Sequence, residues 1–100
     1  MLYQIKEADM AYVVIMEFDA DWVTHLKIDE AVGDKPVKGL IVHAAGPCEV
    51  GTRTFDIWAS HEDSERFFGE RIAPALQALG IEGGPPLSVQ AFNAEIVRVS

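Results

Sequence analysis

The sequence predicts a single α+β domain over residues 1–100, in which an antiparallel sheet carries two helices and the elements follow the order β-α-β-β-α-β. Two observations predict this class. Short apolar and β-branched runs alternate with longer segments whose apolar residues recur at helical spacing. Glycine and proline residues stand at the junctions, where turns are required. Close to half of the residues are apolar, which is enough for one packed core.

The N-terminal third holds the first strand and the first helix. MAYVVIMEF at 10–18 is almost continuously apolar, which is typical of a strand covered on both faces. A helix follows, because Asp19 or Asp21 can cap its start and Gly33 can end it. Apolar residues recur along it near helical spacing: Trp22, Leu26 and Val32.

The middle of the chain predicts a β-hairpin. After a loop marked by Pro36 and Gly39, LIVHAAG at 40–46 is typical of a strand, and TRTFDIWA at 52–59 is typical of the next. The connection PCEVG between them is short, so the two strands should be antiparallel neighbours.

The C-terminal third predicts a helix and a last strand. Ser60 and Asp63 form a capping-box signature, and Gly80 terminates the helix. Pro74 lies inside the helix and lacks a backbone N–H, so we expect a kink or a restart near residue 72. The apolar stripe of this helix consists of Phe67, Phe68, Ile72, Leu76 and Leu79. LSVQAFNAEIVRV at 87–99 closes the chain as one long strand.

This order of elements is the ferredoxin-like arrangement, in which both helices lie on one face of the sheet. The first strand is apolar on both sides, so the opposite face of the sheet also needs a cover. The simplest cover is the same face of a second copy. We therefore expect a homodimer whose two sheets form a shared barrel.

Composition and charge exclude several partners. The net charge is −8 and the eight basic residues are scattered, so nucleic acid is not an expected partner. The apolar run at 11–16 is too short to cross a bilayer, so no membrane partner is expected. Cys48 is the only cysteine, which fits a reducing cytoplasm. The sequence contains no glycine-rich phosphate loop and no metal-ligand motif, so we expect no metal and no tightly bound cofactor.

His43 interrupts the small and aliphatic run of the second strand. Side chains alternate along strands, so Thr54, Asp56 and Trp58 share one face of the third strand. If the hairpin turns about residues 49–50, His43 falls opposite Asp56. We expect the purely apolar faces to meet the helices. That would leave the polar set, His43 included, on the face that a dimer encloses.

A carboxylate beside an imidazole fixes its tautomer and raises its pKa, which suits a general base. His43 and Asp56 are therefore candidate catalytic residues, although the same pair is also a common way to satisfy two buried polar groups without chemistry. Packing alone explains many tryptophans, and a histidine on a helix often faces solvent. The candidate substrate-binding residues are Trp58 and Trp22 as apolar walls, with Tyr12, His25 and Phe67.

FDIWASHEDSERFF at 55–68 resembles the third strand and second helix of the dimeric α/β-barrel superfamily. HAAGP at 43–47, EFD at 17–19 and ERIAPAL at 70–76 are similar to small bacterial proteins near the antibiotic-biosynthesis monooxygenase group. The resemblance covers most of the chain and implies the ferredoxin-like homodimer. It does not imply one reaction, because the superfamily includes cofactor-free monooxygenases, polyketide cyclases, muconolactone isomerases, haem-degrading enzymes and stress-induced proteins.

Two functions follow as expectations. The first is a cofactor-independent enzyme of monooxygenase, cyclase or isomerase type that acts on a small hydrophobic, aromatic or polyketide-like molecule, with His43 as base. Haem degradation is disfavoured, because Phe67 and Phe68 stand where such relatives place a ligating histidine. The alternative is a non-catalytic dimeric ligand-binding or stress-associated protein in which His43 and Asp56 form a structural pair.

Overall fold

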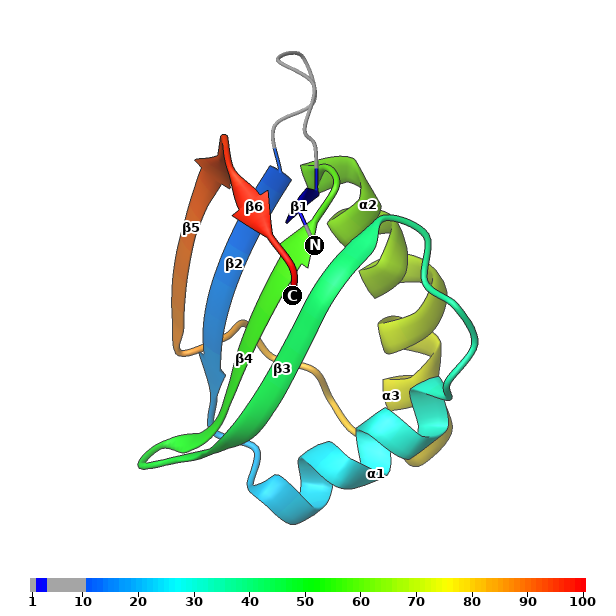
Figure 1. The fold of residues 1–100 in the computed structure, drawn as a ribbon. Coiled ribbons are helices and arrows are strands. Elements are labelled where there is room, and N and C mark those ends of the chain that lie inside the picture. Colours follow the sequence, from blue (N-terminus) through cyan, green and yellow to red (C-terminus); the bar gives the residue numbers. More distant parts are fainter. Residues whose placement is uncertain (1, 4–10) are drawn as a thin grey trace.

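A four-stranded antiparallel sheet forms the centre of the molecule. The computed structural model describes residues 2–3 and 11–100 (Figure 1). The sheet has the order β3-β4-β2-β5. Its strands are β2 (Ala11–Phe18), β3 (Leu40–Cys48), β4 (Gly51–Trp58) and β5 (Ser88–Ala94). With β2 as the first strand of the predicted order, this topology is compatible with the ferredoxin-like arrangement.

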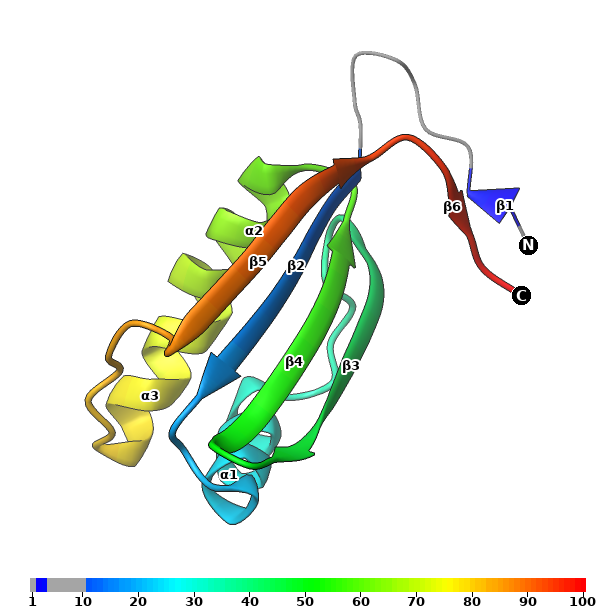
Figure 2. The ribbon, with the colours of Figure 1, turned by 90° about the vertical axis from the view of Figure 1, so that its left-hand side faces the viewer.

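Helices cover one face of this sheet, as Figure 2 shows. Helix α1 (Trp22–Val32) connects β2 to β3. A longer helical segment connects β4 to β5 and consists of α2 (His61–Phe67), a π-helical turn η1 (Phe68–Ile72) and α3 (Ala73–Leu79). The predicted α+β class with helices on one face is confirmed.

Helix boundaries follow the predicted caps. Asp21 accepts a hydrogen bond from the backbone N–H of Thr24 at 2.8 Å, and Ser60 accepts one from the backbone N–H of Asp63 at 3.1 Å. At the other end of the second helical segment, Gly80 takes the left-handed conformation (φ 68°) that closes α3. Side chains of the sequence therefore decide where these helices begin and end.

The restart predicted near residue 72 is confirmed. The backbone N–H of Ala73 bonds to the carbonyl of Phe68, five residues back, which is the spacing of a π-helical turn. Pro74 then lies in the first turn of α3, where a missing N–H costs little. The π-helical turn η1 thus separates the two α-helical parts, α2 and α3, of this segment.

The single long strand predicted at 87–99 is wrong. β5 ends at Ala94, and a separate strand β6 (Val97–Arg98) pairs with β1 (Leu2–Tyr3) on the side of the sheet away from the helices (Figure 2). Ala94 already pairs with Ala11, the first residue of β2, so a longer β5 would have no β2 residue beside it. The chain instead folds back, and Val97 packs on that side of the sheet.

The prediction of which sheet face meets the helices is also wrong. The buried positions of β4 are the polar and aromatic ones on the helix side: Thr52, Thr54, Asp56 and Trp58. The apolar side chains Phe55 and Ile57 lie on the opposite face, where they pack around Val13. Two of these polar side chains are hydrogen-bonded beneath the helices: Thr52 donates to the carbonyl of Ala20 at 2.8 Å, and Asp56 accepts a hydrogen bond from His43. The hydroxyl of Thr54 has no hydrogen-bond partner among the described residues.

Candidate functional site

A cavity of about 280 Å³ lies between α1 and the helix-facing side of the sheet. Its walls come from α1 and the loop after it, from β3 and β4, and from the middle of the second helical segment. Most of its surface is apolar, with Ile28, Val32, Leu40 and Trp58 among the lining residues. Titratable side chains also line it: His25, His43 and Asp56, together with Asp29, Asp34 and Lys35. A mostly apolar hollow with a few convergent polar groups is typical of a small-molecule site.

The β3–β4 register places His43 directly opposite Asp56, as predicted. Nδ1 of the His43 imidazole and Oδ1 of Asp56 are hydrogen-bonded, and the contact becomes an ion pair when the imidazole is protonated. The two side chains differ in burial: 42% of the His43 side chain is exposed, against 11% of the Asp56 side chain. Asp56 thus holds the imidazole through Nδ1, and the imidazole is the more exposed member of the pair at the cavity.

The hydrogen bond to Asp56 raises the pKa of His43 above its usual value. Partial burial of the ring acts in the opposite direction, and the charges of Asp56 and Asp29 add to the increase. The result is an imidazole that is more basic than a free histidine side chain. It is also fixed in orientation by its carboxylate partner.

A β-bulge in β3 brings Leu40 to the cavity as well. Leu40 pairs with Trp58 and Val42 pairs with Ile57, so Ile41 is an extra residue in β3. Simple alternation predicts Leu40 on the face opposite His43, but both residues line the cavity. The bulge could not be read from the sequence, because no glycine or proline marks it.

His25 lines the cavity from α1 instead of pointing outward. Its ring stacks on Trp22, with ring centroids 5.2 Å apart and planes tilted by 14°. Burial lowers the pKa of His25, while the charge of Asp29 opposes that effect and the nearby His43 reinforces it. The pKa values of His25 and His43 are therefore shifted in opposite directions within one cavity.

The aromatic candidates divide into two groups. Trp58 is buried, lines the cavity and contacts Phe67, with ring centroids 5.3 Å apart. Trp22 and Tyr12 lie outside the cavity lining. Trp22 stacks on the ring of His25, and the Tyr12 ring contacts the ring of His61, with 4.6 Å between the ring centroids. The Nε1 atom of Trp58 has no hydrogen-bond acceptor among the residues that the structure describes.

Sequence reasoning missed the cavity-lining residues of α1 other than His25. Ile28, Asp29 and Val32 follow His25 at intervals of three, four and seven residues, which is the spacing of one helix face. That pattern was available in the sequence. Trp22 and Leu26 define a competing stripe in the sequence, yet nearly half of Leu26 is exposed.

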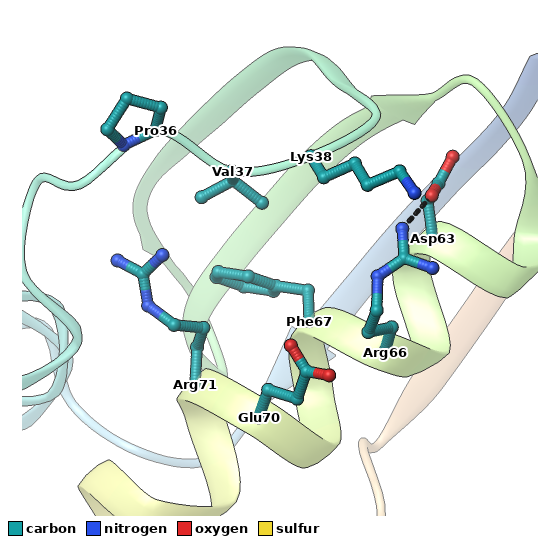
Figure 3. Close-up of a pocket in the computed structure, with 8 residues that line it drawn as sticks. All are labelled: Pro36, Val37, Lys38, Asp63, Arg66, Phe67, Glu70 and Arg71. Atoms are coloured by element: carbon teal, nitrogen blue, oxygen red, sulfur yellow. Dashed lines mark hydrogen bonds and ion pairs between the residues drawn. The ribbon is translucent and has the colours of Figure 1, made fainter.

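A second, smaller cavity of about 170 Å³ adjoins the first, and Val37 and Phe67 line both. Figure 3 shows the Phe67 ring between the Arg71 guanidinium and the ion pair of Arg66 with Asp63. Arg71 donates to the carbonyl of Val32 at 3.0 Å and so ties the second helical segment to the end of α1. These bonds fix the position of the wall that the two cavities share.

No cluster of three or more histidine, cysteine, aspartate or glutamate side chains within residues 2–3 and 11–100 could hold a metal ion. Over the same residues, no helix has the length and apolar character needed to cross a membrane. Comparison of the chain with protein-family models, with curated proteins and with solved structures gave no match. The chemistry of the site therefore has to be inferred from its own geometry.

Proposed function

We propose that the protein is a cofactor-independent enzyme that moves a proton on a small, largely apolar molecule, aromatic or polyketide-like in character, bound between α1 and the sheet. His43 is the base and Asp56 is the residue that positions it. The observation that carries the proposal is the bond of His43 Nδ1 to a nearly buried carboxylate at the wall of an apolar cavity. Reaction types open to such a site include an isomerisation, a cyclisation and an oxygenation that starts from a deprotonated phenol.

The environment of His43 supports a basic role. Asp56 accepts a hydrogen bond from Nδ1–H, so the neutral ring carries its lone pair on Nε2, the atom that can accept a proton from a bound molecule. The raised pKa makes that lone pair a stronger acceptor. The apolar walls would exclude water from the reacting atoms and strengthen the electrostatic effect of the pair.

A structural role for the same pair is the second candidate function. Asp56 is only 8% exposed, and a carboxylate at that depth needs a partner whether or not chemistry takes place. In that case the protein binds a small molecule without turning it over. Its His43→Gln variant, whose amide still bonds to Asp56, would then bind ligands normally.

The two candidates can be separated by screening small aromatic ketones, phenols and polyketide-like compounds for turnover. A substrate consumed by the wild type should be consumed at least about 100-fold more slowly by His43→Gln, because general-base catalysis contributes a factor of this size. His61→Gln is the matched control, since this histidine lies outside the cavity lining. Full turnover by His43→Gln would exclude the base assignment.

We also propose that the protein is a homodimer built on the dimeric α/β-barrel plan. The sheet face away from the helices carries the apolar side chains Ile15, Phe55, Ile57 and Phe92, and 59% of Phe92 is exposed. A patch of this kind is typical of an interaction surface. A second copy related by a two-fold axis would bring two such faces together.

A further inference from the structure

We propose that His25 is a second catalytic residue of the cavity: an uncharged imidazole whose ring N–H donates a hydrogen bond to the carbonyl oxygen of the substrate while His43 removes a proton from the adjacent carbon. This inference rests on the proposed function and narrows it. The reaction becomes a redox-neutral enolisation, with a carbonyl compound as substrate and a double-bond isomer or tautomer as product.

The geometry places two imidazoles around one space. His25 reaches the cavity from the helix layer and His43 reaches it from the sheet, so a bound molecule can contact both rings. The stack on Trp22, with planes 14° apart, holds the His25 ring in one orientation. Asp21 caps the same turn of α1, because it bonds to the backbone N–H of Thr24, next to His25. His25 is therefore held by rigid neighbours, as a group that must orient a substrate needs to be.

The charges around the cavity give the two rings different roles. His25 faces Asp29 on its own helix, and His43 and Asp56 on the sheet; Asp34 and Lys35, in the loop after α1, also line the cavity. Burial outweighs these carboxylates and lowers the pKa of His25, which favours its neutral form. A neutral imidazole always retains one N–H donor. Two titratable groups whose environments separate their pKa values are typical of acid–base sites.

The proposed step needs no second reactant. The C–H bond next to the carbonyl breaks, its proton moves to Nε2 of His43, and its electron pair forms the C=C bond of an enolate. The negative charge on the oxygen is stabilised by the N–H of His25. The proton then returns from His43 to another carbon of the conjugated system. One C–H bond is lost and one is gained, so the substrate is neither oxidised nor reduced.

The probe for this step is 2-tetralone, a small aromatic ketone with an acidic α-hydrogen. Exchange of that hydrogen for solvent deuterium is followed by ¹H NMR in D₂O with the wild-type protein and four variants. His25→Phe keeps a ring to stack on Trp22 but has no N–H, and we expect it to lose about 100-fold in kcat. His25→Asn retains an N–H donor and should recover part of that loss. His43→Gln should abolish exchange, and His61→Gln should leave it unchanged.

The pH profile provides the second readout. The exchange rate should rise with pH as His43 loses its proton. In His25→Phe the pH midpoint of this rise should be the same as in the wild type, while the maximal rate at high pH should be lower. Wild-type exchange that depends on His43 but is unaffected by His25→Phe would overturn the role of His25 and leave the proposed function intact. Absence of exchange above the buffer rate in the wild type would count against both.

Discussion

His43 on β3 and Asp56 on β4 are cross-strand partners, joined through Nδ1 and Oδ1 at the wall of a mostly apolar cavity. The carboxylate is nearly buried and the imidazole is half exposed. Because of this difference, Asp56 can hold His43 in place while His43 remains accessible to a ligand. The pair therefore has measurable consequences for titration and stability, even before a substrate is known.

Asp56→Asn should lower the pKa of His43. The hydrogen bond that His43 donates to Asp56 is the largest cause of the increase, and the variant loses both that charge-assisted bond and the nearby negative charge. Burial of the ring, which favours its neutral form, is then opposed only by the charge of Asp29, so His43 should titrate at a lower pH than in the wild type. Two-dimensional NMR of the imidazole resonances measures this. An unchanged titration would mean that Asp56 does not set the charge of His43.

His43 should also make the stability of the protein depend on pH. Its pKa is higher in the folded than in the unfolded chain, so protonated His43 stabilises the fold. That contribution is complete below the unfolded pKa and is lost as pH rises through the folded pKa. The difference in unfolding free energy between wild type and His43→Gln should thus be larger at about pH 5.5 than at about pH 9. Urea unfolding at both pH values measures it, and equal differences would contradict the prediction.

Trp58 should contribute to stability mainly through packing. It is 2% exposed and contacts Phe67, so Trp58→Ala should cost about 3–5 kcal/mol of unfolding free energy. Trp58→Phe should cost only about 1–2 kcal/mol, because it keeps an aromatic ring and removes an N–H that has no acceptor in the described part of the chain. Urea unfolding distinguishes the two variants. Similar losses in both would contradict a contribution made mainly through packing of the ring.

Phe92→Glu should separate the proposed dimer into monomers. Phe92 lies on the open face of the sheet and is 59% exposed in the single chain, so the change should not damage the monomer fold. Sedimentation should show twice the chain mass of 11.0 kDa for wild type and the chain mass for the variant. Phe68→Glu is the matched control, because 57% of Phe68 is exposed and it lies on the helical side. A wild-type protein that sediments as a monomer would refute the dimer.

The order of the four strands of the main sheet and of the two helical segments, the helix caps and the pairing of His43 with Asp56 were all predictable from the sequence, whereas the strands β1 and β6 were not. Each depends on local signals: periodicity, capping residues such as Asp21 and Ser60, and a hairpin whose short turn fixes the register. The interruption of the second helix was predictable for the same reason, because Pro74 cannot donate a backbone hydrogen bond.

Tertiary structure alone decided which face of the sheet the helices cover. Alternation assigns His43, Asp56 and Trp58 to one common side, but it does not say what packs against that side. Which side is covered depends on how α1 and the second helical segment dock. These helices enclose His43, Asp56 and Trp58, and Phe55 and Ile57 lie on the face away from the helices. The bulge at Ile41 and the meeting of His25 with His43 likewise depend on contacts between residues far apart in the chain. Local sequence patterns carry no information about such contacts, because docking is determined by the complementary shapes of complete surfaces.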